Sequence, residues 1–122
     1  MAKLVADAVL DAALNILKNN ANIMTACNAQ PANRTDAVTT YMLGNVAMNS
    51  SDYTVADGDT NGRKVTMSQK SNVTVAANGT ANHVALCDGS SLLYVTTATA
   101  QALTSGNTMT FNSWKIEIAD PT

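Results

Sequence analysis

Apolar residues near the N-terminus recur at helical spacing, whereas those in the rest of the chain mostly alternate with polar ones. Residues 5–19, VADAVLDAALNILKN, place their apolar side chains on one stripe, formed by Val5, Val9, Leu10, Ala13, Leu14 and Leu17. The opposite side is polar, with Asp7, Asp11, Asn15 and Lys18. An acid near the start and a base near the end suit the helix dipole. The pattern therefore predicts an amphipathic helix over residues 5–19.

From residue 22 to residue 122 the pattern predicts mostly antiparallel β-structure. One exception is a short helix over residues 36–43, with Thr35 or Asp36 as its cap. The expected strands are residues 22–27, 45–49, 53–56, 64–67, 72–75, 83–88, 92–98 and 114–119. Short strands separated by Gly- and Asn-containing turns are typical of a β-sandwich or small barrel. We therefore expect an α+β fold, mainly β with an N-terminal helix, in a single domain spanning residues 1–122.

Three turn signals separate the later strands. Asn78-Gly79 is the strongest of them, because both central residues of a type I′ hairpin turn need positive φ. The sequence therefore predicts a hairpin between residues 72–75 and 83–88. Two further turns are expected at residues 88–91, DGSS, and 105–107, SGN.

The composition of the chain argues against nucleic acid and membranes as partners. The chain has 122 residues, seven basic and nine acidic, and a formal net charge of −2. No basic patch is present that would bind nucleic acid. No apolar run approaches the ~20 residues that span a bilayer, so we expect no membrane partner. Asp7 and Asp11 also interrupt the first apolar run, which is atypical of a signal peptide and predicts synthesis in a cytoplasm.

The segment DGDTNG, residues 57–62, begins like an EF-hand calcium loop, with Asp57, Asp59 and Asn61 as candidate metal ligands. The twelfth position of such a loop must be a bidentate carboxylate, but here it is Ser68. Basic and alternating residues follow where a helix is needed. We therefore predict a turn between strands, with no metal and no cofactor, in which Gly58 and Gly62 adopt conformations that other residues disfavour.

The chain lacks a recognisable catalytic set. His83 is the only histidine. It is four positions from Cys87, so their Cα atoms in a strand would be roughly 13 Å apart, too far for a nucleophile–base pair. Cys27 and Cys87 are expected to be reduced and buried, as is usual in a cytoplasm; a disulfide or a metal site is the alternative. No G-x-S-x-G segment occurs. The sequence thus favours a protein that is not an enzyme over a small hydrolase or metal-dependent enzyme.

The apolar content suggests an assembly component. Val, Leu, Ile and Phe make up only 24 of the 122 residues, and small domains with modest cores often gain stability by packing against a partner. Several side chains on the predicted helix are small, and small side chains permit close approach of a neighbouring surface. The candidate interaction residues form an Ala-rich set on the helix, namely Ala6, Val9, Ala13 and Leu17.

Four segments carry a resemblance to a known family: ADAVLDAALN, ADGDTNGRKVTM, HVALCDGSSLLYVTTATAQALTSGNT and WKIEIADP. Together they resemble small virion structural proteins encoded by tailed bacteriophages and prophages. The resemblance implies no catalytic residues and a location in the virion, after synthesis in the host bacterial cytoplasm. It suggests a capsid decoration or cement protein that binds the outside of the major capsid protein lattice as a homo-oligomer or in many symmetric copies. The alternative is a neck, tail or fibre component, including a receptor-binding tip.

Overall fold

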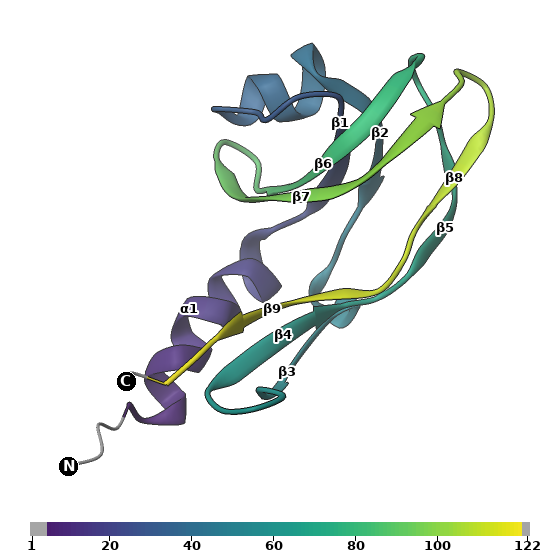
Figure 1. Cartoon of the computed structure of the whole chain (residues 1–122). Helices are drawn as coiled ribbons and strands as arrows, with labels where there is room; N and C mark the ends of the chain where they lie inside the picture. Colours follow the sequence, from purple (N-terminus) through teal and green to yellow (C-terminus); the bar gives the residue numbers. More distant parts are fainter. Residues whose placement is uncertain (1–4, 121–122) are drawn as a thin grey trace.

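The computed structural model describes residues 5–120 and shows one α-helix followed by nine strands (Figure 1). The elements are α1 (Asp7–Asn20), β1 (Ile23–Cys27), η1 (Asp36–Thr40), β2 (Met42–Ala47), η2 (Ser50–Asp52), β3 (Tyr53–Asp57), β4 (Arg63–Met67), β5 (Lys70–Thr74), β6 (Gly79–Cys87), β7 (Leu92–Leu103), β8 (Thr108–Phe111) and β9 (Trp114–Ile118). The α+β fold with an N-terminal helix is confirmed. Residues 1–4 and 121–122 of the expected domain lie outside the described residues.

The strands form three antiparallel sheets. The largest has the order β2-β1-β6-β7, the second has the order β3-β4-β9, and β5 pairs with β8 in a two-stranded ribbon. In Figure 1 the four-stranded sheet lies in the upper part of the molecule and the β3-β4-β9 sheet lies beside α1 in the lower part. The β5-β8 ribbon runs between these two parts. The arrangement is sandwich-like, with the core between its layers.

The helix α1 is displaced slightly from its predicted position, because it begins at Asp7 and ends at Asn20. Its last turn closes where the N–H of Ala21 donates to the carbonyl of Leu17. Only Leu10, Leu14 and Leu17 of the helix are buried. These three residues recur at spacings of four and three, so they lie on one face that packs on β3 and β4.

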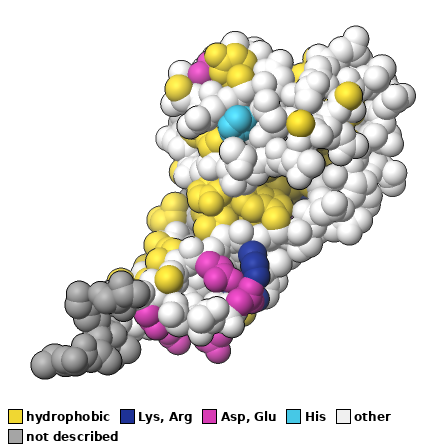
Figure 2. Space-filling view, viewed as in Figure 1, with side chains coloured by type: hydrophobic (Ala, Val, Ile, Leu, Met, Phe, Trp, Pro, Cys, Tyr) yellow, Lys and Arg dark blue, Asp and Glu magenta, His cyan; other side chains and the backbone are white. Residues whose placement is uncertain are grey.

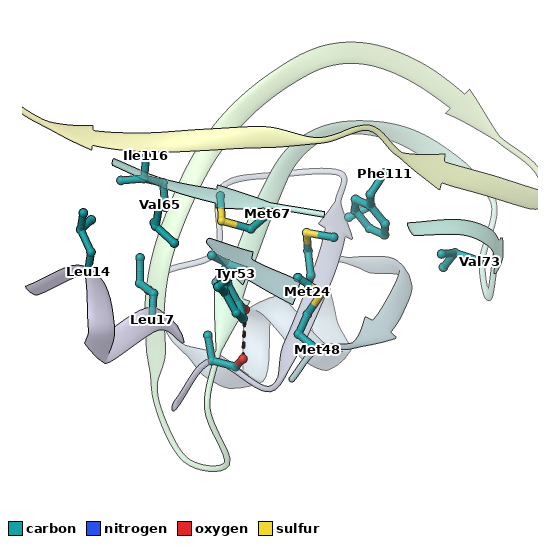
Figure 3. Close-up of a cluster of buried hydrophobic side chains, with 13 residues drawn as sticks. Leu14, Leu17, Met24, Met48, Tyr53, Val65, Met67, Val73, Phe111 and Ile116 are labelled. Carbon is teal, nitrogen blue, oxygen red and sulfur yellow. Dashed lines mark hydrogen bonds between the residues drawn. The ribbon is translucent and has the colours of Figure 1, made fainter. Parts of the chain in front are cut away.

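The main core gathers side chains from α1 and from all three sheets, and Figure 3 shows them pointing toward one another. Its buried members are Leu14, Leu17, Ala21, Met24, Ala26, Met48, Tyr53, Val65, Met67, Val73, Leu86, Phe111 and Ile116. Tyr53 is only 2 % exposed, and its hydroxyl donates to the carbonyl of Ala21 at 2.9 Å. This bond fixes the end of the helix to the start of β3.

The predicted hairpin at Asn78-Gly79 is wrong. β5 pairs with β8, and β6 pairs with β1 and β7, so the strands on either side of this dipeptide do not meet. Asn78 has no positive φ, as a type I′ turn requires. Instead its Oδ1 accepts a hydrogen bond from the N–H of Ser105 at 2.7 Å. Pairing of β5 with β8, which is distant in the sequence, therefore replaces the expected local pairing of β5 with β6.

The short helix expected over residues 36–43 is only partly present. Residues Asp36–Thr40 form a single π-helical turn, and β2 begins at Met42 rather than at residue 45. Thr35 is at the N-cap position, as expected, but its side chain makes no capping hydrogen bond. Asn33 acts instead: its Oδ1 accepts from the N–H of Asp36 at 2.9 Å.

Asp52 is a buried carboxylate at the junction of η2 and β3. It accepts from the N–H of Asn49 at 2.9 Å and forms an ion pair with Lys70 at 2.8 Å. Burial alone raises the pKa of Asp52, but the hydrogen bond from Lys70, the N–H of Asn49 and the charge of Lys70 together hold that pKa below its ordinary 3.8. The folded state therefore favours the ionised carboxylate.

We expect Asp52→Asn to lower the free energy of unfolding by about 1–2 kcal/mol at pH 7, because hydrogen bonds to a charged group are lost. A lowered folded-state pKa stabilises the protein above the ordinary pKa, and this contribution is lost as the pH falls through the folded value. Denaturation by urea at several pH values should therefore show the two proteins converging below about pH 4. A difference that stays constant down to about pH 2 would contradict this account.

Candidate interaction surfaces

The outer face of α1 carries apolar side chains that the molecule leaves uncovered. Val9 is 62 % exposed and Ile16 is 52 % exposed. These are the large hydrophobic residues with the greatest exposure among those described. Ala6, which precedes the helix, and Ala13 are exposed as well. An exposed apolar helix face of this kind is a feature of interaction sites.

The structure keeps three of the four predicted interaction residues accessible. Leu17 is the exception, since it is 7 % exposed and belongs to the core. The sequence pattern predicts one apolar stripe, but the apolar residues of α1 divide into a buried face and an exposed face. Ile16 was missed for this reason, although it lies seven residues after Val9 and three after Ala13 and so shares their face.

Arg63 fastens this helix to the β3–β4 hairpin. Its Nε donates to Asp11 Oδ1 at 2.7 Å and its Nη1 to Asp57 Oδ1 at 2.6 Å. The hydrogen bonds from Arg63 to these two carboxylates raise the pKa of the guanidinium. Because Asp11 lies on α1, the pair sets the position of the helix, and with it the position of the exposed apolar face.

The turn between β3 and β4 contains the candidate metal ligands, and each of them is engaged by the protein itself. Asp57 pairs with Arg63, Asp59 pairs with Lys64 and Lys115, and Asn61 Oδ1 accepts from the N–H of Asp120. Among the residues described, no three His, Cys, Asp or Glu side chains gather in a way that could hold a metal ion. The segment is a turn between strands, as predicted.

The two glycines of this turn are needed for different reasons. Gly62 has φ +69°, as expected, whereas Gly58 has no positive φ, so that part of the prediction is wrong. At Gly58 the constraint is space: an added Cβ would lie 2.1 Å from the carbonyl oxygen of Asn61. The tightness of the turn therefore excludes a side chain there, whatever its backbone conformation.

Cys27 and Cys87 are free and fully buried beneath η1. Burial raises the pKa of both thiols; a hydrogen bond with Thr25 partly offsets this for Cys27, as does the charge of Arg34 for Cys87. The residue directly opposite His83 is Cys27, not Cys87. The Cys27 Sγ donates instead to the carbonyl of Ala37, and the His83 ring pairs with Asn82. Both thiols thus remain protonated and enclosed at neutral pH.

A groove of about 550 Å³ separates β7 from the β8–β9 segment. Figure 2 shows this part of the surface as an apolar recess across the middle of the molecule. The groove is lined by Val84, Thr96, Thr97, Ala98, Thr99, Gln101, Thr110, Phe111, Asn112, Ser113 and Trp114. None of these residues is charged. The sequence pattern does not predict this groove, because Trp114 alternates with polar residues as a core residue of a strand does.

No protein-family model, curated protein or solved structure matches the chain. None of the helices among residues 5–120 has the length and apolar character needed to cross a membrane.

Proposed function

We propose that the protein is a structural component of a tailed-phage virion, and specifically a capsid decoration protein that binds the outer surface of the major capsid protein lattice. The observation that carries the proposal is the exposed apolar face of α1, centred on Val9 and Ile16. The resemblance of four sequence segments to virion structural proteins supports the same assignment.

The exposed helix face suits attachment to a broad protein surface. Leu10, Leu14 and Leu17 hold the other side of the helix on the body of the protein, and Arg63 secures it through Asp11. The face is therefore presented on a fixed element and needs no ordering when it docks, which lowers the cost of binding. Several copies arranged around a lattice axis, each of which binds weakly, would together bind strongly by avidity.

Bound copies would stabilise an expanded shell, because a ligand that binds only the assembled form shifts the equilibrium toward it. Phage heads that lack the protein should assemble, yet they should release DNA at a lower temperature. Adding purified protein should restore heat resistance and should saturate at a fixed ratio to the capsid subunit.

The double variant Val9→Asn, Ile16→Asn tests the docking face. Asn has a helix propensity close to those of Val and Ile, so the fold should persist while the apolar contact is lost. We expect binding to depleted heads to weaken by at least about tenfold. Quantitative sedimentation of heads with added protein measures this. The matched control is Ala47→Asn, Ala76→Asn, at exposed positions outside α1 and outside the groove, which should bind like the parent chain.

Two results would contradict the proposal. Equal binding by the helix variant and the control would remove the helix face as the docking surface. A few copies per virion, all at the neck, tail or fibre, would favour one of those locations instead of capsid decoration. Absence of the protein from purified virions would exclude both virion assignments.

A further inference from the structure

The strands β7 and β8 follow each other in the chain, yet they do not pair. Residues 104–107 form a tight turn between them, which in most antiparallel hairpins leads to a shared ladder. Here β7 pairs with β6, whereas β8 pairs with β5. The two strands therefore diverge from their turn into different sheets, as Figure 1 shows.

This divergence leaves open sheet edges on both sides of the groove. β7 is an edge of the four-stranded sheet, β8 is an edge of the ribbon, and β9 is an edge of the three-stranded sheet. Residues 97–102 of β7 are exposed throughout, as are Thr110, Asn112 and Ser113 on the other side. Unpaired main-chain groups on such edges are ready to bind another strand.

A bulge in the pairing of β7 with β6 leaves main-chain groups of β7 without partners on this side of the groove. Ala81 is opposite Gln101 and His83 is opposite Thr97, so residues 98–100 of β7 face a single residue of β6. Such a bulge leaves extra residues without partners in the ladder and redirects their side chains. Residues on both sides of the bulge line the groove.

Trp114, which lines the groove, carries an unsatisfied polar group. Its Nε1 is buried and has no hydrogen-bond partner in the part of the chain described. A buried donor without an acceptor destabilises the folded state. The indole lines the groove and packs beside Tyr94, with ring centroids 6.0 Å apart.

We infer that the groove binds an extended, uncharged segment of a partner protein, which adds a strand between β7 and the β8–β9 segment. An extended peptide can use its main chain on both of its edges at once. The eleven residues that line the groove carry no charge, while charged residues gather in the lower part of the view in Figure 2. A lysine or glutamate side chain directed into the groove would lose solvent without gaining an ionic partner.

A second copy of this chain fits the groove less well. Each edge strand of the copy, such as β7, has one free edge, because its neighbour in the sheet occupies the other. An element with one free edge cannot pair on both sides of the groove. The occupant is therefore a free segment, such as a terminal arm or a loop, of a different protein.

The experiment uses the intrinsic fluorescence of the purified chain, because Trp114 is its only tryptophan and lines the groove. The probe is an end-blocked peptide of seven residues in which threonine and valine alternate. We expect a saturable change in emission. The same peptide with N-methyl groups at alternate residues cannot hydrogen-bond along one edge, and a version with lysine in place of valine carries charge into the groove. Each should bind at least about tenfold more weakly.

Variants locate the binding. Thr99→Lys introduces a charge into the groove and should weaken the plain peptide by at least about tenfold. Thr80→Lys makes the same change at an exposed position of the adjacent strand β6, outside the groove, and should leave binding unchanged. Circular dichroism establishes that both variants are folded.

Several outcomes would overturn the inference. They are no saturable response to the plain peptide, equal binding of the N-methylated peptide, or equal loss in the two variants. Saturable binding of maltoheptaose without binding of the peptide would assign the groove to a neutral saccharide. A dimer in sedimentation that Thr99→Lys separates would assign it to a second copy. Attachment to phage heads is a separate measurement, so either proposal can fail alone.

Discussion

Replacing Tyr53 with Ala is expected to lower the free energy of unfolding by about 3–5 kcal/mol, as for other large aromatic residues removed from a core. Tyr53 is 2 % exposed and is the largest of the fully buried side chains among those described. It lies between α1 and the sheets, so neighbouring elements cannot close the cavity without moving the helix. Because small domains have only about 5–15 kcal/mol of net stability, this single change should leave much of the protein unfolded on moderate warming.

Tyr53→Phe separates the contribution of the hydroxyl from that of the ring. Burial, with a smaller effect of the Asp52 charge, raises the pKa of Tyr53 to about 12, so the hydroxyl remains a donor at neutral pH. Its loss leaves the carbonyl of Ala21 without this bond and should cost about 1 kcal/mol. Urea denaturation of the three proteins measures both quantities. Similar losses in the Phe and Ala variants would show that the bond to the helix end, and not packing, is the main contribution of this residue.

Gly62→Ala is the second change with a large expected effect, about 2–5 kcal/mol. Two costs combine at this position. The backbone has φ +69°, which disfavours any side chain by about 1–2 kcal/mol. In addition, the new Cβ would lie 1.9 Å from the carbonyl oxygen of Ile118, which forces main-chain atoms apart and adds about 1–3 kcal/mol, as in other overpacked sites.

Gly106→Ala is the matched control. Gly106 also has a positive φ, +89°, but an added Cβ would meet nothing within 4 Å. It should therefore show the backbone cost alone, about 1–2 kcal/mol. The difference between the two melting temperatures isolates the collision with β9. If the two variants lost equal stability, the contact with Ile118 would be easily relieved and the close approach of the turn to β9 would not matter.

Features governed by neighbouring residues were predictable from the sequence. The helix, the alternating strands and the turn at residues 57–62 all appear near their expected places. The turn at residues 88–91 is also present, where Asp88 Oδ1 accepts from the N–H groups of Ser90 and Ser91. In each case side chains act on their own backbone or follow one regular period, so a short window contains the relevant information.

Features that depend on distant pairing were not predictable in this way. The Asn78-Gly79 dipeptide favours a local hairpin between β5 and β6. In the structure β5 pairs instead with β8, a strand more distant in the sequence. The division of α1 into two apolar faces depends on which side meets β3 and β4, and helical spacing alone does not decide this. The groove was missed for the same reason, since it exists only because consecutive strands enter different sheets.

The pairing of β4 with β9 has a consequence for how the protein is made. Arg63 is opposite Ile118 and Met67 is opposite Trp114, so the two strands are some fifty residues apart in the chain. During translation β4 and α1 leave the ribosome well before β9 exists, and one edge of β4 stays open in that interval. Strand pairings between distant residues also form slowly. The nascent chain therefore passes through a period in which this edge is open to incorrect pairing, and it ends only when β9 emerges and docks.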